Sequence, residues 1–296
     1  MRPSVQTSIA LIGPGAVGGS VAVWLAQSPE HDVTLCARTS FDRLEVETPD
    51  GPVAATPPVL SNPTQAQPTD WALVATKTYD ADAAARWLER LVGPHTRVVV
   101  LQNGVEHVAR FAPFVPAERI VPAVVDIPAE RSAPGLIRQR RMGTILVPKG
   151  DNGDAFVHLF ARTPIGVSTT DDFTTAAWTK LALNCAGAVS ALTLRPGGIA
   201  WRDDIADIQR AMVRECVAVG RAEGAKLEGD LPDEVIAKYR AAPGDSVNSL
   251  HADRAAGRPM ELDARNGVIV RLGAKHGIAT PINAMIVALI EAAAAA

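Results

Sequence analysis

The chain has 296 residues, which is enough for one large domain or two domains of ordinary size. Hydrophobic residues make up 47% of it and charged residues 21%, a mixture that can bury a large core and is too apolar for a disordered protein. The formal net charge of −3 argues against a nucleic-acid partner or an anionic membrane surface, because both attract basic patches. No apolar run approaches the ~20 residues of a membrane span, and we expect no signal peptide. Three widely spaced cysteines, at positions 36, 185 and 216, fit a reducing cytoplasm.

The first part of the chain alternates short apolar runs with helical patterns. This alternation predicts strands at 8–13, 33–38, 71–77 and 97–103, and helices at 16–28 and 80–92, the second helix beginning at an Asp80 cap. Strands that alternate with helices favour a parallel sheet. The segment 49–68 holds six prolines and is expected to wander along the surface with one weak strand near Val59. Further strands are predicted at 120–126, 135–141 and 143–148, the last two as a candidate hairpin.

From about residue 170 onward the pattern is helical. The periodicity predicts helices at 172–194, 203–225, 233–242, 245–257, 261–277 and 280–293. The sequence therefore predicts an α/β protein with a Rossmann-type parallel-sheet domain at residues 1–168. An all-helical domain follows at residues 169–296.

A glycine-rich loop follows the first predicted strand and opens the first predicted helix. Its residues Gly13, Gly15 and Gly18, with Ala16 and Val17 between them, form the pattern G-x-G-x-x-G. In that context the first glycine allows the tight turn, the second lets the backbone approach a pyrophosphate, and the third lets the helix sit close to the strand. The alternative is a plain tight turn with no ligand.

The residue after the second strand distinguishes the two nicotinamide cofactors. NAD sites usually carry an acidic residue there to bind the ribose 2′-hydroxyl group, whereas this chain has Arg38 and no acid before Asp42. A guanidinium can bind a 2′-phosphate with two hydrogen bonds, which predicts NADPH as the cofactor. The alternative is a solvated surface arginine.

Two polar residues end predicted parallel strands. Lys77 ends WALVATK and Asn103 ends RVVVLQN. Ligands of open α/β sheets bind at the carboxyl ends of strands, so Lys77 is a candidate to contact cofactor or substrate. Asn103 is a candidate to bind cofactor and substrate, near the nicotinamide or the reacting carbonyl group. The alternatives are a lysine whose head reaches solvent and an Asn-Gly turn.

The helical half offers four candidates for substrate chemistry. Lys180 and Asn184 are four residues apart, so they share one face of a helix made mostly of small and apolar residues. An ammonium group there suits proton donation, unless the lysine simply lies at the helix edge with its head in water. Ser249 is a candidate to bind a substrate carboxylate or to cap a helix. Glu261 is a candidate to pair with Lys180 or to hold the substrate, unless it is simply a first-turn acid stabilised by the helix dipole.

The chain resembles the ketopantoate reductases (2-dehydropantoate 2-reductases) over essentially its whole length. The resemblance rests on GPGAVGG at the start, Lys77, LQNGV at 101–105, WTKLALN at 178–184, and NSLHAD with AGRPMELDARNGVIVRLGAKHGIATP within 248–281. It implies a Rossmann domain and a helical domain with the active site in the cleft between them. The implied activity is NADPH-dependent reduction of a 2-oxo acid in pantothenate biosynthesis.

The resemblance also implies residue roles. Lys180 would be the general acid, and Glu261 would help to orient it. Asn184 and Ser249 would contact the substrate, and Asn103 would lie at the junction of cofactor and substrate. No metal is implied, and the six histidines are scattered without ligand spacing.

Two positions depart from the family pattern. Ala188 and Gly198 stand where members of the family often carry asparagines. Loss of such hydrogen-bonding groups relaxes or shifts specificity, so a reductase of a different oxo acid or ketone stays an alternative. A non-catalytic module that senses NADP(H) for a partner is a second alternative. The sequence leaves open whether the final helices form a homodimer.

Overall fold

The computed structural model describes residues 6–294. Within that range the chain forms two compact units, which divide between Phe173 and Thr174 and have separate hydrophobic clusters. The boundary expected from the sequence, between residues 168 and 169, lies five residues before this division. In the same range no helix has the length and apolar character of a membrane span.

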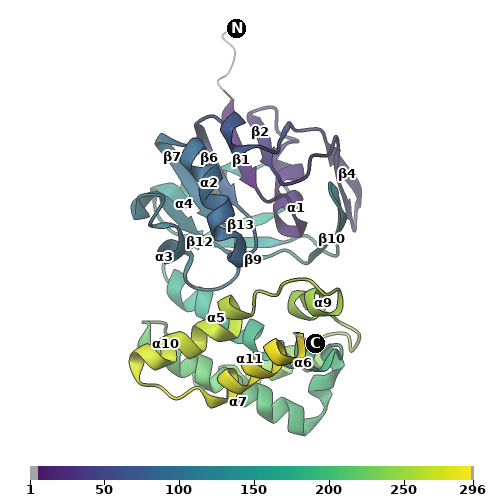
Figure 1. The fold of residues 1–296 in the computed structure, drawn as a ribbon, viewed down its shortest axis with the longest axis vertical. Coiled ribbons are helices and arrows are strands. Elements are labelled where there is room, and N and C mark those ends of the chain that lie inside the picture. The colour runs from purple at the N-terminus through teal and green to yellow at the C-terminus, as the bar shows by residue number, and fades with distance from the viewer. Residues whose placement is uncertain (1–5, 295–296) are drawn as a thin grey trace. The chain divides into compact units, whose positions relative to one another are not determined.

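A six-stranded sheet forms the centre of the first unit (Figure 1). All of its neighbouring strands are parallel, as the sequence predicted. The order is that of a doubly wound fold, in which the chain moves outward from a central first strand in both directions. In spatial order the strands are β5 (Val59–Leu60), β2 (His31–Cys36), β1 (Thr7–Ile12), β6 (Thr69–Val74), β7 (Val92–Val100) and β8 (Ile120–Pro122).

Alternate residues of each strand point to opposite sides of the sheet, so the apolar strands present a hydrophobic surface on both faces. Helices cover both of these faces. Leu11 packs in the cluster with α1 (Ala16–Leu25), and its neighbour Ile12 packs in the cluster with α2 (Ala81–Leu91). Strands that are buried on both faces read as unbroken apolar runs, which is why they could be predicted. The unit also contains the helices α3 (His107–Phe111) and α4 (Asp151–Leu159), and 3₁₀ turns at Pro63–Gln65, Thr78–Asp80 and Ala117–Arg119.

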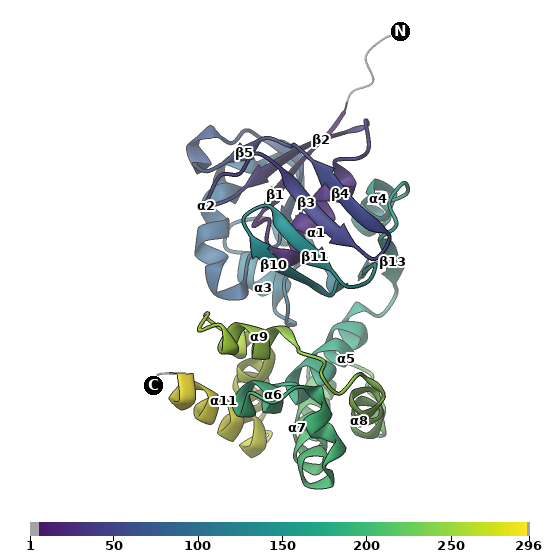
Figure 2. The same cartoon turned by 90° about the vertical axis from the view of Figure 1, so that its right-hand side faces the viewer.

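A second sheet covers the outer side of α1 (Figure 2). Gly19 of α1 lets the helix and this sheet pack closely, because a Cβ at this position would displace the end of the Ile137 side chain. The proline-rich segment 49–68 was expected to carry a single weak strand; this is wrong, because it also supplies β4 of this sheet. Gly51, with φ of +113°, closes the hairpin that the prediction missed. The strands are, in spatial order, β10 (Ala129–Ala133), β11 (Leu136–Gln139), β3 (Leu44–Thr48) and β4 (Gly51–Ala55).

The predicted hairpin between 135–141 and 143–148 is also wrong. The first of these segments contains β11, which pairs with β10 and, in parallel, with β3. The second forms the middle strand of a separate sheet, where its partners satisfy its backbone groups. That sheet consists of β13 (Gly166–Thr170), β12 (Thr144–Pro148) and β9 (Val124–Asp126). The strand β13 and the helix α4 were not predicted.

The second unit is helical, as predicted. Its helices, the first of which begins at the unit boundary, are α5 (Phe173–Ala186), α6 (Ala188–Thr193), α7 (Asp203–Ala222), α8 (Leu231–Ala241), α9 (Ser249–Ala255), α10 (Val268–His276) and α11 (Pro281–Ala294). A 3₁₀ turn spans Gly197–Trp201, and a single π-helical turn spans Asp263–Gly267 at the start of α10.

One predicted helix of this unit is two helices in the structure. The pattern predicted a continuous helix over 172–194, but the chain breaks at Gly187 between α5 and α6. A Cβ on Gly187 would lie 2.7 Å from the Tyr239 hydroxyl oxygen and 2.9 Å from Asn248 Nδ2. Side chains from distant parts of the sequence therefore approach the chain closely at the break, and helical periodicity does not report such contacts.

Candidate active site

The glycine-rich loop joins β1 to α1 in a conformation that requires glycine. Gly13 has φ of +83°, and a Cβ on Gly18 would lie 2.9 Å from the side chains of Leu11 and Ala75. At Gly15, by contrast, the nearest atom to an added Cβ is 4.0 Å away, so the loop is open to a ligand there. No side chain caps the first turn of α1, so backbone N–H groups at its start can bind an anion.

Arg38 was expected to end the second strand, and it lies two residues after β2, which ends at Cys36. Its side chain is 86% exposed, and Nη2 lies 3.7 Å from Asp80 Oδ2. Asp80 occupies the N-cap position of α2, as predicted, but its side chain makes no capping hydrogen bond. The guanidinium is therefore accessible and only weakly held, at the strand end where a ribose would lie in a doubly wound fold.

Lys77 and Asn103 lie three residues beyond the ends of β6 and β7. These strands are parallel neighbours, and β6 also pairs with β1, which leads into the glycine-rich loop. The carboxyl ends of the three strands thus share one sheet edge. The fold therefore brings the loop, Lys77 and Asn103 to the same edge.

Gln102, which was not among the predicted site residues, holds these two strand ends together. Its side chain is 4% exposed, and Nε2 donates to Thr76 Oγ1 at 3.0 Å and to the Lys77 carbonyl at 3.3 Å. Its Oε1 accepts from Arg110 Nη1 at 3.1 Å. One amide group therefore fixes the loop after β6 relative to the loop after β7. The sequence signal that could have predicted this role is the position of the Gln102 amide, next to Asn103 at the end of a strand.

His107 of α3 supports the same loop from inside the unit. Its Nε2 lies 2.9 Å from the Gln102 carbonyl oxygen, and its ring meets the edge of Phe173. Burial lowers the pKa of His107 to about 4, and the nearby Arg110 acts in the same direction. The ring is therefore neutral near pH 7, and Nε2 is the nitrogen that donates to the carbonyl.

In the second unit, α5 carries Lys180 and Asn184 on one face, and both side chains are half-buried. Trp178, on the same helix, is buried against Gly220 of α7, which has no room for a Cβ. The helix that bears the candidate acid is thus anchored by packing on its far side.

Side chains from other segments bind the carbonyl oxygens at the end of α5. The helix dipole concentrates partial negative charge on these carbonyl groups. They have no hydrogen-bond donor within the helix, so without these side chains they would have to bind water. The bonds run from Tyr239 Oη to Leu183 O at 2.9 Å, from Asn266 Nδ2 to Cys185 O at 3.2 Å, from Gln209 Nε2 to Ala186 O at 3.0 Å, and from Asn248 Nδ2 to Gly187 O at 3.0 Å. The last turn of α5, which includes Asn184, is therefore held by side chains from several other segments.

Ser249 and Glu261 lie in contrasting environments. Ser249 is exposed at the start of α9, and the residue that caps this helix is Asn248, whose Oδ1 accepts from His251 N at 3.0 Å. The alternative of Ser249 as the cap is therefore wrong. Glu261 immediately precedes the helical residue Leu262 and is 6% exposed.

Comparisons with known proteins identify the family. Two family models, ketopantoate reductase PanE/ApbA and its C-terminal counterpart, match residues 9–152 and 172–294. The chain is 67% identical over 289 residues to a 2-dehydropantoate 2-reductase of Caulobacter vibrioides, an alignment that covers 98% of this chain and 100% of that protein. The chain belongs to the ketopantoate reductase family.

Solved structures of family members share the fold. A PanE/ApbA family ketopantoate reductase of Ralstonia eutropha superposes with a TM-score of 0.89 at 32% identity, over 97% of this chain and 98% of that one. A dimeric ketopantoate reductase of Staphylococcus aureus superposes with a TM-score of 0.85 at 25% identity, over 96% and 98%. The predicted fold class and the resemblance are thus confirmed.

The first unit of this ketopantoate reductase family member fits a dinucleotide. The open approach at Gly15 and the uncapped start of α1 suit a pyrophosphate. Arg38 is exposed at the strand end, and no carboxylate stands between Cys36 and Asp42 to bind a 2′-hydroxyl group. These features suit a 2′-phosphorylated ribose better than an unphosphorylated one.

The structure accounts for one of the two departures from the family pattern. The Gly198 N–H donates to the Gly244 carbonyl at 2.9 Å, and a Cβ on Gly198 would also lie 2.9 Å from that oxygen. An asparagine at 198 would force these two loops apart. Ala188 is fully buried at the first position of α6, so its methyl group belongs to the core of the unit.

The buried charged side chains of residues 6–294 interact with one another, and of these only Glu261 was predicted from the sequence. Asp253 is 8% exposed, Glu261 6% and Arg265 4%, and no other Asp, Glu, Lys or Arg within residues 6–294 is buried to this extent. Both carboxylates interact electrostatically with Arg265. Over that same range no group of His, Cys, Asp and Glu side chains could hold a metal ion.

Proposed function

We propose that this protein reduces 2-dehydropantoate (ketopantoate) to pantoate with NADPH, a step in pantothenate biosynthesis. The observation that carries the proposal is the 67% identity to the Caulobacter vibrioides 2-dehydropantoate 2-reductase, because it extends over 289 residues and so over both units. The first unit would bind the nucleotide, and the second would bind the oxo acid.

The nucleotide would be held by residues at the carboxyl edge of the six-stranded sheet. Backbone N–H groups of Ala16 and Val17 bind the pyrophosphate, which approaches the chain at Gly15. Arg38 binds the 2′-phosphate with its planar guanidinium, at the cost of a weak ion pair with Asp80. Lys77 binds the cofactor from the adjacent loop.

The chemical step would use the polar residues of the second unit. NADPH, when bound, supplies a hydride to the keto carbon. Lys180 stabilises the negative charge that develops on the keto oxygen and donates the proton that completes the hydroxyl group. Glu261 orients Lys180, while Asn184 and Ser249 bind the substrate. Asn103, from the first unit, binds near the reacting carbonyl group.

The replacement Lys180→Ala tests this assignment. We expect kcat for ketopantoate to fall by ~10²–10⁴-fold, because a positioned proton donor contributes about that factor, while the Kd for NADPH stays at the wild-type value. The exposed Lys238 on α8 supplies the matched control, and Lys238→Ala should leave both constants unchanged. Retained turnover in Lys180→Ala would assign the proton donor to another residue.

A second candidate function is reduction of a different 2-oxo acid by the same chemistry. Ala188 and Gly198 favour it, because neither can donate the side-chain hydrogen bonds of an asparagine. A panel of 2-oxo acids, assayed by the absorbance of NADPH, decides between the two substrates. Tight NADPH binding without turnover of any member of the panel would instead favour the non-catalytic sensor.

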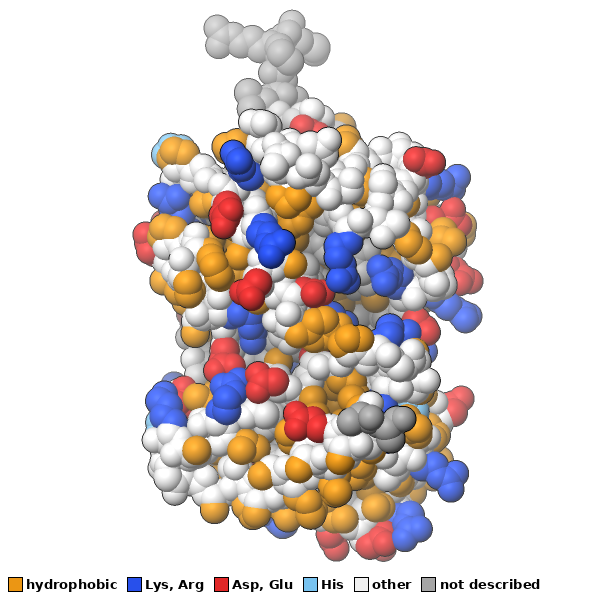
Figure 3. All heavy atoms as spheres, in the orientation of Figure 1, with side chains coloured by type: hydrophobic (Ala, Val, Ile, Leu, Met, Phe, Trp, Pro, Cys, Tyr) orange, Lys and Arg blue, Asp and Glu red, His pale blue; other side chains and the backbone are white. Residues whose placement is uncertain are grey.

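We also propose a cytoplasmic homodimer. The three cysteines are free thiols, which suits a reducing compartment. On the face shown in Figure 3, Lys and Arg side chains are interspersed with Asp and Glu and form no broad basic patch.

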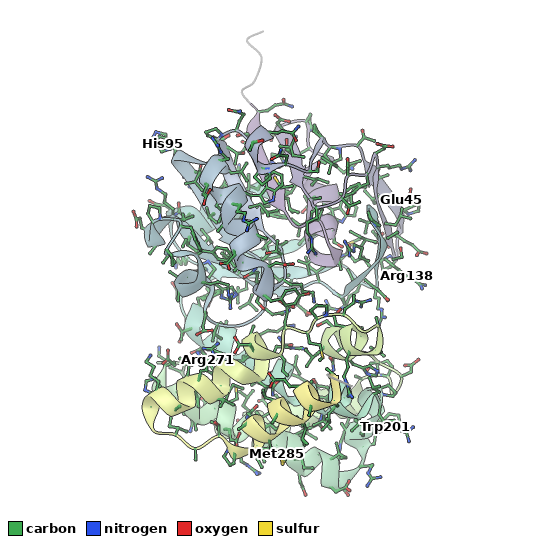
Figure 4. All side chains as sticks on the ribbon, in the orientation of Figure 1. Glu45, His95, Arg138, Trp201, Arg271 and Met285 are labelled. Carbon is green, nitrogen blue, oxygen red and sulfur yellow. The ribbon has the colours of Figure 1, made fainter. Side chains whose placement is uncertain are left out.

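In the second unit, Trp201, Met285 and Leu289 are 59%, 48% and 45% exposed, and Figure 4 labels the first two. The relative from Staphylococcus aureus is a dimer, and sedimentation of this protein at micromolar concentration tests the assignment.

A further inference from the structure

The segment that follows β6 lies directly against the glycine-rich loop. A Cβ on Gly13 would lie 2.8 Å from Thr76 Cγ2 and 2.9 Å from Thr76 N, and a Cβ on Gly18 would lie 2.9 Å from Ala75 Cβ. Close-packed neighbours of this kind cannot shift independently of each other. The position of Thr76 therefore limits where the loop can lie.

The Gln102 side chain bonds this segment to the end of β7, next to Asn103. One hydrogen of its Nε2 is directed to Thr76 Oγ1 at 3.0 Å, and the other to the Lys77 carbonyl at 3.3 Å. The same carbonyl accepts from Asp80 N at 3.0 Å, which closes the turn that begins at Lys77. A single amide group thus contacts both the residue that packs on the glycine-rich loop and the backbone of Lys77.

Two basic side chains of the first unit fix the orientation of Gln102. Arg110 Nη1 donates to its Oε1 at 3.1 Å, and a guanidinium has no acceptor, so the oxygen must face Arg110 and Nε2 must face the β6 segment. His107 Nε2 donates to the Gln102 carbonyl at 2.9 Å and holds its backbone. The Gln102 side chain is 4% exposed, so solvent does not readily replace these bonds.

We propose that Gln102 is a positioning residue for the cofactor. It places Lys77 and Asn103 relative to the glycine-rich loop, so that the pyrophosphate and the nicotinamide of NADPH can be bound together. The inference rests on the proposed function, in which these residues bind the nucleotide. Arg38, the proposed ligand of the 2′-phosphate, follows a different strand and is paired weakly with Asp80, at 3.7 Å. Binding of the 2′-phosphate should therefore depend little on Gln102.

Calorimetric titration with two nucleotides tests this role without turnover. Gln102→Met keeps the length of the side chain and removes its amide, so we expect the Kd for NADPH to rise by about 5- to 50-fold, from two lost hydrogen bonds to the β6 segment. Adenosine 2′-monophosphate carries the 2′-phosphate but neither pyrophosphate nor nicotinamide, and its Kd should stay at the wild-type value. Unchanged NADPH binding, or an equal loss for the two nucleotides, would overturn the proposal.

Thr76→Val removes the hydroxyl group that accepts from Gln102 and keeps the methyl group that lies against Gly13. We expect the Kd for NADPH to rise by about 2- to 10-fold in this variant. Combined with Gln102→Met, it should add no further loss, because the bond between the two side chains is already absent. Additive losses would show that the two side chains act separately, and the proposal would then be wrong.

Gln139 in β11 supplies a matched control, because it is also a buried glutamine of the first unit. Its side chain is 2% exposed, and its Nε2 donates to the Arg141 carbonyl at 3.0 Å. We expect Gln139→Met to lower the urea midpoint of unfolding and to bind NADPH like the wild type. If Gln139→Met weakens NADPH as much as Gln102→Met does, the effect is a general one of losing a buried amide, which contradicts the positioning role.

The titrations also separate this inference from the proposed function. If the wild type binds NADPH but does not reduce ketopantoate, the proposed function is wrong, while the nucleotide titrations still decide the role of Gln102. If the wild type reduces ketopantoate and Gln102→Met binds NADPH as the wild type does, only the positioning role is wrong.

Discussion

Under the proposed function, a single side chain at the sheet edge, Arg38, selects between the two nicotinamide cofactors. Arg38 is 86% exposed, and its one recorded ion pair, to Asp80, is long at 3.7 Å. Exposed pairs of this kind contribute ~0–1 kcal/mol, so little energy is lost when the guanidinium turns to a phosphate. A hydrogen bond to a charged group contributes more, ~1.5–3 kcal/mol.

Replacement of this side chain should therefore affect the two cofactors unequally. We expect Arg38→Ala to weaken NADPH binding by roughly 10–150-fold and to leave NADH binding unchanged, because only NADPH carries the 2′-phosphate. Calorimetric titration of both nucleotides measures the difference. As a control, Asp80→Asn removes the ion pair with Arg38 and should not weaken NADPH binding. An equal loss for the two nucleotides would mean that Arg38 does not contact the 2′-phosphate.

Among the elements, the break between α5 and α6 bears on the placement of the candidate substrate residues Asn184 and Ser249. Asn248 acts at two places at once, because its Oδ1 caps α9 and its Nδ2 binds the Gly187 carbonyl after α5. One side chain therefore links the helix that carries Asn184 to the helix that begins with Ser249. The relative placement of these two candidate substrate ligands depends on it.

Loss of this side chain should destabilise the helical unit and impair substrate binding. For Asn248→Ala we expect a decrease of about 1–3 kcal/mol in the free energy of unfolding, from the lost cap and the unpaired carbonyl. The KM for the oxo acid should rise more than the KM for NADPH. The control is Asn62→Ala, which removes a cap from the 3₁₀ turn of the first unit and no other bond. If the two variants are equally stable, the second bond of Asn248 contributes nothing.

At the scale of the whole molecule, buried ionisable groups limit the pH range in which the chain stays folded. His107 has a pKa of about 4 in the folded chain, against an ordinary value of 6.5. Below pH 6.5 the unfolded chain binds a proton on this ring that the folded chain does not bind. The stabilisation is therefore complete above pH 6.5 and is lost as the pH falls toward 4.

Urea unfolding at a series of pH values measures this effect. Between pH 6.5 and 4 we expect His107 to account for a loss of about 3 kcal/mol, and His107→Gln to show a correspondingly flatter dependence. His95 is exposed at the margin of the first unit (Figure 4), and His95→Gln should retain the wild-type dependence. An unchanged pH dependence in His107→Gln would contradict the assignment.

The sequence pattern correctly predicted the structural features that depend on residues close together in the chain. The central strands are buried on both faces, so their unbroken apolar runs predict them from the sequence. Gly13 and Gly18 occupy positions where a side chain would collide with neighbouring atoms. The candidate residues Lys77 and Asn103 were found because they follow such strands. The dipeptide Asp50-Gly51 is also a local signal for a turn between two strands. The hairpin was not predicted there because the surrounding prolines suggested an irregular segment.

The sequence by itself therefore determined the fold class, the glycine-rich loop and the identity of the candidate site residues. Tertiary structure alone decided that β11 pairs with β3, about ninety residues earlier in the chain, and that α5 ends where Tyr239 and Asn248 approach it. It also decided that Arg265 is buried among acids instead of lying in solvent. These outcomes depend on contacts between distant segments, and hydrophobic periodicity reports only which face of a segment is buried, not what lies against it.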